Sequence, residues 1–517
     1  MPKSVSQKIL RNTSFNIFAR MVHMAAYLVI IPVIINNVGQ ARYGIWVILF
    51  AFVDYFSLLD LGFGAATVKY TADHYAQNDI FRVGQTVITA LLFHLFIVPV
   101  IVIPVFFAEN IINLFNVSPE NMGEAIFVLR GVLLIFAFSQ VTSVFRNLLI
   151  GLQLIDIQSL CDMVNTLLYA VGGIIVVKAG LGLKGLVLLT GGLRILLVVA
   201  HAFFVFKRVP QMKSGLIHFN AKMLKEFFKY GVRLQVTSFA GLFNFQLDKL
   251  LIGYFLRMEM VAFYDLGSKI AMLIRQIPSV LLSPLIPASA ELSVKADRKR
   301  LEAMHLQGAK YLILMAAPIA AFLIAMAPSV MTLWIGKNDH SYAVLALRIL
   351  SIGYFFNIIT GVVTSMGRGM GILYYEMNAS CFIALSNLFL SLLLIMKMGF
   401  IGVLIGTSIS MTVGNVVYFY RFNRYLGTAF MRFVKDALIG PVFFAVLAGG
   451  IIWVTQDLVG NSLILTLISR MEIMMYLGFA GVFFLVLYGG GLVLSGCLGR
   501  LEVQLIGETI RSLCRVL

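Results

Sequence analysis

Charged side chains in the middle of long apolar segments are the feature that most constrains this chain. The sequence reads as a succession of segments of roughly 20 apolar residues, the length that crosses the hydrocarbon core of a bilayer as a helix. Several of these segments carry Arg, Lys or Asp near their midpoint. A charged group at that depth is too costly to face lipid, so we expect these side chains to line a polar cavity inside a helix bundle.

Composition excludes the soluble protein classes. Charged residues make up 12% of the chain, half of the roughly 25% that is typical of soluble domains. The net charge of +17 does not indicate nucleic-acid binding, because no soluble segment offers a basic face and basic cytoplasmic loops explain it better. The cysteines are scattered, without a CxxC pair or a Cys/His cluster, so we expect neither a metal site nor a cofactor.

The apolar segments predict about fourteen transmembrane helices and an all-α polytopic membrane protein. The first segment follows a basic start, but it is long and lacks a small-x-small cleavage site. We therefore interpret it as an uncleaved span and not as a signal peptide. The expected spans are 14–36, 43–66, 83–107, 125–149, 155–178, 182–206, 230–255, 260–290, 308–336, 342–366, 374–398, 400–424, 437–456 and 474–497.

The distribution of basic residues sets the expected orientation. With the N-terminus in the cytoplasm, most of the 40 Lys and Arg residues fall in cytoplasmic connections, as the positive-inside rule requires. We therefore predict that both termini are cytoplasmic.

A long basic connection after the sixth span predicts two six-helix lobes. Six is an even number, so both lobes enter the membrane in the same direction, and we expect a parallel repeat with a pseudo-twofold axis along the membrane normal. The stretch 220–229 alternates lysines with apolar residues, as an interfacial amphipathic helix does. The expected parts are an N-terminal lobe (1–206), a cytoplasmic linker (207–229), a C-terminal lobe (230–424), two further spans (425–497) and an amphipathic cytoplasmic tail (498–517).

Three cations lie well inside their spans on polar helical faces, and we predict that they bind anionic cargo. They are Arg20, Lys269 and Arg275. Arg grips a phosphate group through a two-pronged hydrogen-bonded fork, and Lys supplies a point charge. A diphosphate head group that crosses the bilayer core needs such counter-charge.

Other polar residues at helical spacing extend this set. For any one of them a structural role, as a helix-locking ion pair or as a side chain that snorkels to the membrane surface, explains the pattern equally well. The further cavity cations are Arg130, Arg146 and Lys249, the polar cavity residues are Asn16, His23, Gln235, Gln246 and Asn357, and the carboxylates for a coupling cation or an ion pair are Asp54, Asp60, Asp162, Asp248 and Asp265.

The N-terminal spans carry a recognisable pattern. The turn VGQARYGIW (38–46) is followed by LDLGFG (59–64) and by the cationic Lys69. This segment resembles the polysaccharide-transporter family of lipid-linked oligosaccharide flippases, in the superfamily that also holds multidrug and toxin extrusion antiporters and lipid II flippases. The resemblance implies two six-helix lobes, a cationic central cavity and alternating access.

The same resemblance implies the cargo and its setting. The cargo would be an undecaprenyl-diphosphate-linked oligosaccharide, moved from the inner to the outer leaflet of a bacterial cytoplasmic membrane for surface polysaccharide, such as O-antigen, biosynthesis. Beside this glycan and the membrane lipids, the implied partners are a polysaccharide polymerase and a chain-length regulator. With two lobes in one chain, a monomer suffices.

Two other classes of protein are alternatives to a flippase. A multidrug and toxin extrusion antiporter handles mostly cationic drugs, which the intramembrane cations would repel, although the carboxylates could bind its coupling cation. A membrane glycan polymerase or ligase should have sizeable outside loops, whereas the expected outside segments 108–124 and 457–473 are short. We therefore expect a transporter and no enzyme.

Overall fold

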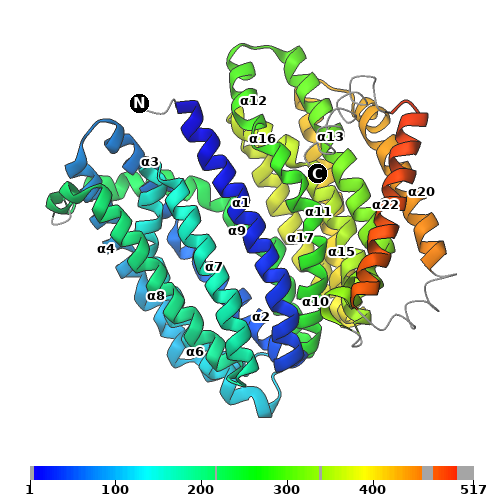
Figure 1. Ribbon diagram of the computed structural model, residues 1–517. Helices are drawn as coiled ribbons and strands as arrows, with labels where there is room; N and C mark the ends of the chain where they lie inside the picture. The colour runs from blue at the N-terminus through cyan, green and yellow to red at the C-terminus, as the bar shows by residue number, and fades with distance from the viewer. Residues whose placement is uncertain (1–4, 216–217, 337–339, 457–469, 498–517) are drawn as a thin grey trace. The chain divides into compact units, whose positions relative to one another are not determined.

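The computed structural model describes residues 5–215, 218–336, 340–456 and 470–497 (Figure 1). Within these ranges the chain is helical and forms no β-strand. Twelve helices are long and apolar enough to cross a membrane, and a bent pair, Met258–Leu282 with Leu285–Val294, adds a thirteenth when it is counted as one span. The predicted all-α, multi-pass membrane protein is thereby confirmed.

The count of fourteen spans differs from this result by one helix. The twelve helices and the bent pair coincide with thirteen of the expected ranges. The remaining range, 230–255, is helical but is not among the apolar spans. Polar residues such as Asn244 and Asp248 lower the hydropathy of this segment, and a helix that is partly polar needs protein or water around it.

The described chain divides into two compact units, the first of which is Met1–Ala262. Within unit 1, α1 runs beside α7 and α6 runs beside α8, while α4 also packs against α6 (Figure 1). Its helices are α1 (Val5–Val38), α2 (Gln40–Asp54), the 3-10 helix η1 (Tyr55–Asp60), α3 (Phe63–Ala76), α4 (Ile80–Phe106), α5 (Ala108–Ile112), α6 (Pro119–Gly151), α7 (Ile155–Lys178), α8 (Gly182–Arg208), η2 (Pro210–Gly215) and α9 (Ala221–Phe255).

The second membrane segment of unit 1, Gln40–Asp60, ends at a break in the helix. After α2 the backbone tightens into η1, and Leu61 and Gly62 then adopt left-handed conformations with φ of 46° and 78°. Two features of the structure require glycine at position 62. Its φ suits glycine, and a Cβ at this position would collide with the backbone of Gly231 in α9.

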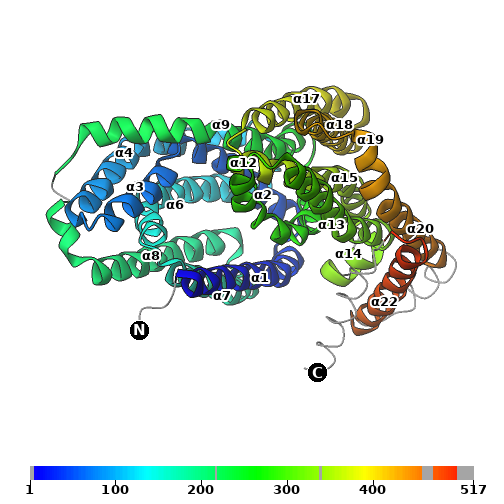
Figure 2. The same cartoon turned by 90° about the horizontal axis from the view of Figure 1, so that it is seen from above.

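The long helix α9 begins where the interfacial helix was expected. The side chain of Asn220 accepts hydrogen bonds from the first turn, and the helix then runs without a break to Phe255. Two apolar residues at its start are buried in unit 1, because Met223 meets Thr86 of α4 and Phe227 stacks on Tyr70 of α3. Phe228, the next residue, is exposed, and the interfacial position of this segment stays a prediction. Figure 2 shows α9 passing along α4.

Unit 2 comprises Phe263–Leu517, and α10 carries the chain into it. Its core is built from α15, α17 and α18, with α13 packed on α15 and α20. The predicted tail 498–517 lies outside the described residues. The helices are α10 (Met258–Ala271), α11 (Leu273–Gln276), η3 (Pro278–Leu282), α12 (Leu285–Val294), α13 (Arg298–Ala325), α14 (Ala327–Ile335), α15 (Ser341–Ile359), α16 (Gly361–Gly369), α17 (Tyr374–Met398), α18 (Phe400–Leu426), α19 (Phe430–Phe433), the π-helix η4 (Val434–Ile439), α20 (Gly440–Thr455) and α22 (Arg470–Leu494). The lobe boundaries and the pseudo-twofold repeat stay predictions.

Candidate functional site

A polar cluster inside unit 1 is centred on the carboxylate of Asp162 in α7. Arg146 of α6 places Nε 3.5 Å from Asp162 Oδ2, and His201 of α8 places Nε2 3.9 Å from Asp162 Oδ1. The amide of Gln158 donates to the same carboxylate. Arg194 of α8 also interacts with it electrostatically. We call these five residues the Asp162 cluster.

Helix α1 adds an aromatic and imidazole edge to the cluster. His23 Nδ1 lies 3.2 Å from the hydroxyl of Thr166, one turn beyond Asp162 on α7. Tyr27 stacks on Tyr169 with ring centroids 6.4 Å apart. Arg20, one turn before His23, is exposed on the surface of unit 1.

The charges of the Asp162 cluster do not balance. Two guanidinium groups, those of Arg146 and Arg194, surround one carboxylate. The side chain of Arg146 is 49% exposed and that of Asp162 is 34% exposed. Charged side chains that are this exposed in a membrane protein need water, lipid head groups or a charged ligand around them, because hydrocarbon does not tolerate them. An anion with several oxygens could take the place of Asp162 on the arginine side chains.

Two members of the Asp162 cluster, Arg194 and His201, were not among the residues predicted from the sequence. Both lie on α8, seven residues apart, and residues at that spacing share one helical face. A search for paired polar residues at positions i and i+7 within the span 182–206 would have found them.

Asp54 and its neighbours join α2 to α9. Asp54 Oδ2 accepts a hydrogen bond of 2.9 Å from the Gln246 amide, and Lys249 interacts electrostatically with the same carboxylate. Asp248, on an adjacent side of α9, is fully buried. These contacts lie within unit 1 and fit a role in holding the two helices together.

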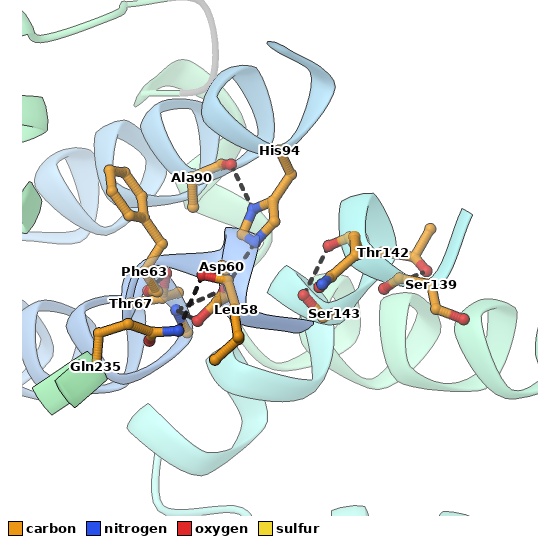
Figure 3. Close-up of polar contacts among 12 residues, drawn as sticks. Leu58, Asp60, Phe63, Thr67, Ala90, His94, Ser139, Thr142, Ser143 and Gln235 are labelled. Atoms are coloured by element: carbon orange, nitrogen blue, oxygen red, sulfur yellow. Dashed lines mark hydrogen bonds and ion pairs between the residues drawn. The ribbon is translucent and has the colours of Figure 1, made fainter. Parts of the chain in front are cut away.

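The helix break holds two further predicted residues (Figure 3). Gln235 of α9 donates an amide hydrogen bond of 2.9 Å to the carbonyl of Leu58 in η1. Asp60 lies 2.9 Å from His94 Nε2 in α4. Backbone groups freed by a broken membrane helix need such partners.

Arg130 lies on the same helix as Arg146, α6, but outside the Asp162 cluster. Its Nε donates to the Val105 carbonyl at 3.3 Å, close to the end of α4, and the residue is exposed. A cation beside the carbonyl end of a helix is stabilised by the helix dipole. This geometry favours the snorkelling reading for Arg130.

In unit 2, each of the two predicted cations has a close companion. Lys269 forms an ion pair with Asp265, one turn earlier on α10, and Asp265 is buried. The guanidinium of Arg275 lies 5.9 Å from the ring centroid of Tyr354 in α15. Cation–π contact of this kind stabilises a desolvated arginine.

Asn357 belongs to a separate amide and hydroxyl group in unit 2. Its Nδ2 lies 3.4 Å from Asn415 Oδ1, which also accepts a hydrogen bond of 3.0 Å from Thr360. The group joins α15 to α18 and carries no charge.

The structure thus brings the predicted residues together in several separate groups, not in one site. Arg146, Asp162 and His23 meet in unit 1, whereas Lys269 and Arg275 belong to unit 2. The convergence of Arg20 with these two cations stays a prediction, and the side chain of Asn16 lies outside the described residues. Among the residues that the structure describes, no group of three or more His, Cys, Asp or Glu side chains could hold a metal ion.

Comparison with known proteins extends these observations. The sequence profile of the family described as "Polysaccharide biosynthesis protein" matches residues 9–293, more than half of the chain. A putative O-antigen transporter of Shigella flexneri is 19% identical over 420 residues, which cover 80% of this chain and 98% of that protein.

Two solved structures share the fold. The lipid II flippase MurJ, in an inward closed conformation, aligns with a TM-score of 0.70 and 16% identity, covering 93% of this chain and 99% of the flippase chain. An inward-facing multidrug resistance MATE family transporter of the MOP superfamily aligns with a TM-score of 0.67 and 17% identity, covering 81% of this chain and 98% of that chain.

Proposed function

We propose that this chain, which belongs to the polysaccharide biosynthesis protein family, is a flippase for a lipid-linked oligosaccharide. The cargo is an undecaprenyl-diphosphate-linked glycan that moves by alternating access from the inner to the outer leaflet of a bacterial cytoplasmic membrane. The relationship to a putative O-antigen transporter and the fold shared with a lipid II flippase support this class of cargo.

The charge surplus of the Asp162 cluster is the observation that carries the proposal. A diphosphate offers several anionic oxygens, and each arginine can bind two of them in a planar, charge-assisted geometry. The separation of 3.5 Å between Arg146 and Asp162 is longer than a direct charge-assisted hydrogen bond. Arg146 can therefore exchange this partner for a phosphate without losing a short bond.

Residues beside the cluster suit the sugar part of the cargo. Tyr27 and Tyr169 offer stacked aromatic faces, and Tyr27 is exposed. His23 is exposed and offers a polar ring within the same group of helices. A phosphate anchor with aromatic neighbours fits an amphiphilic, anionic glycolipid.

The proposal is tested in lipid vesicles that contain the purified protein. The probe is a polyprenyl-diphosphate-linked disaccharide with a fluorophore on the sugar, and a membrane-impermeant quencher outside reports its movement between leaflets. We expect the wild-type protein to speed this movement and both Arg146→Ala and Arg194→Ala to slow it. Arg130→Ala is the matched control, because Arg130 lies apart from the cluster and should keep the wild-type rate. Movement no faster than in protein-free vesicles would refute the proposal.

A cation-coupled antiporter of the multidrug and toxin extrusion type is the second candidate, favoured by the shared fold. The surplus of arginine would repel a cationic drug at short range. Vesicle experiments with ethidium as the probe separate the two candidates. Gradient-driven ethidium transport that is unchanged in Arg194→Ala would favour the antiporter over the flippase.

A further inference from the structure

The helix break of unit 1 places a carboxylate against a buried histidine (Figure 3). Asp60 ends η1, and both of its side-chain oxygens accept from the backbone amide of Gly64 at 3.2 Å. Asp60 Oδ1 also lies 2.9 Å from Nε2 of His94. The pair therefore links the break between α2 and α3 to the neighbouring helix α4.

The hydrogen-bond pattern fixes how many protons the pair needs. His94 Nδ1 lies 2.7 Å from the carbonyl oxygen of Ala90. A carbonyl only accepts, so Nδ1 carries a hydrogen. A hydrogen bond between Nε2 and Asp60 Oδ1 then requires one more proton, held by the imidazole or by the carboxyl group. Without that proton, a nitrogen lone pair would face a carboxylate, and the contact would be repulsive.

The described side chains that meet the pair from neighbouring helices are neutral. Gln235 of α9 donates to the Leu58 carbonyl, and the amide of Asn147 in α6 lies beside Gly64. The hydroxyls of Ser139, Thr142 and Ser143 on α6 donate to carbonyls of their own helix (Figure 3).

Charged residues elsewhere on these helices have other companions. Arg146 of α6 lies beside Asp162, and the ammonium group of Lys69 in α3 lies 4.7 Å from the ring centroid of Tyr230. The side chain of Arg233 in α9 lies outside the described part of the structure.

The pair is exposed on one side only. The side chain of Asp60 is 26% exposed, whereas that of His94 is 1% exposed. Phe63 presents its edge to the imidazole, and Phe93 stacks on Phe63 with ring centroids 3.4 Å apart. A proton can therefore enter through the carboxyl group, while the aromatic side keeps the local dielectric low and strengthens the hydrogen bond.

We propose that Asp60 and His94 form a proton-binding site whose proton holds the helix break against α4. Loss of the proton would separate the carboxylate from the imidazole. Leu61 and Gly62, with their left-handed backbones, are the point at which α3 could then turn relative to α2. Resting on the proposed function, the further step is that transport takes up and releases this proton.

Nitrogen-15 NMR of histidine-labelled protein in lipid nanodiscs tests the site without reference to transport. The signals of His94 are those that are present in the wild-type spectrum and absent from the spectrum of His94→Gln. We expect Nδ1 of His94 to keep its hydrogen while the proton between Nε2 and Asp60 is lost, and we expect Asp60→Asn to remove that step. An unchanged titration in Asp60→Asn, or no change of the His94 signals with pH, would overturn the site.

Transport in vesicles tests the coupling. A single titrating group gives a rate that changes by up to about tenfold per pH unit on one side of its transition. In His94→Gln the amide can still donate to Asp60 but cannot titrate, so the slope should fall below about twofold per pH unit. The matched control is His305→Gln. His305 is a buried histidine of unit 2 whose Nε2 lies 2.8 Å from the neutral Asn423 amide, so this variant should keep the wild-type slope.

The outcomes separate the proton site from the flippase function. A His94 titration together with a wild-type slope in His94→Gln would refute the coupling. An absence of glycan movement by the wild-type protein would refute the flippase, while the NMR titration would still decide whether the proton site exists.

Discussion

The two units hold their intramembrane cations in different ways. Unit 1 gathers two guanidinium groups around the single carboxylate of Asp162. Unit 2 pairs Lys269 with the buried Asp265 inside one helix and places Arg275 over an aromatic ring. A cation with a charged or aromatic neighbour can serve stability alone, whereas a surplus of charge on an exposed face is suited to binding an anion. On this comparison, the Asp162 cluster is a better candidate for anion binding than Lys269.

The largest effect is expected from Lys269→Ala, measured as stability. Removing the ammonium group leaves the buried Asp265 carboxylate without this partner. Breaking a buried pair costs about 3–5 kcal/mol, and because Lys269 is 36% exposed we expect a loss of about 3 kcal/mol. The free energy of unfolding in detergent should fall accordingly, and the double variant Lys269→Ala/Asp265→Asn should recover most of it. A stable Lys269→Ala protein that no longer transports would show that Lys269 also acts in transport, and the two units would then not differ in this respect.

Arg194→Ala should act on transport and leave stability almost unchanged. A hydrogen bond to a charged group contributes about 1.5–3 kcal/mol, which corresponds to a loss of roughly 10- to 150-fold in kcat/KM for the glycan probe. Arg194→Lys should recover part of this loss, because lysine keeps the positive charge but cannot bind a phosphate through two parallel hydrogen bonds. An equal loss in Lys269→Ala/Asp265→Asn would place cargo binding in both units.

Asp162→Asn sharpens the comparison by removing the competing anion. With the carboxylate neutralised, both arginines become available, and the KM for the glycan probe should fall by about three- to tenfold at low salt. Added salt should shrink this difference, since partly exposed charges are screened. A rise in KM would mean instead that Asp162 positions the arginines for the cargo.

The smallest effect is expected from Arg130→Ala. This exposed side chain donates to the Val105 carbonyl, and surface changes of this kind usually stay within about 0.5 kcal/mol. Transport should remain within about twofold of the wild-type rate. A larger loss would extend the anion-binding surface beyond the Asp162 cluster.

The sequence was sufficient for the class of fold and for the order of the spans. Apolar length determines where a helix can cross a membrane, so the expected ranges coincide with the helices of the structure almost throughout. The exception was α9, whose range 230–255 is too polar to stand among the apolar spans. Lysines alternating with apolar residues at its start, 220–229, fit a membrane surface and a helix packed on protein equally well, and the structure shows Met223 and Phe227 buried there.

The candidate site was predicted only in part. Polar residues inside spans could be found one at a time, and Arg146, His23 and Asp162 were among them. Their grouping depends on which helices pack together, and α6, α7 and α8 bring in Arg194 and His201 from a span whose polar residues stood out less. The pair of Asp60 with His94 was beyond reach for the same reason, because the two residues lie 34 positions apart and meet only across packed helices.

The unbroken course of α9 bears on how force travels through the protein. A helix of 35 residues is about 52 Å long, well beyond the roughly 30 Å of a hydrocarbon core. Its basic first turns are therefore one end of a stiff rod that is longer than a hydrocarbon core is thick. A displacement of that end, at Lys222 or Lys225, would tilt the rest of α9 about its close backbone contact at Gly231.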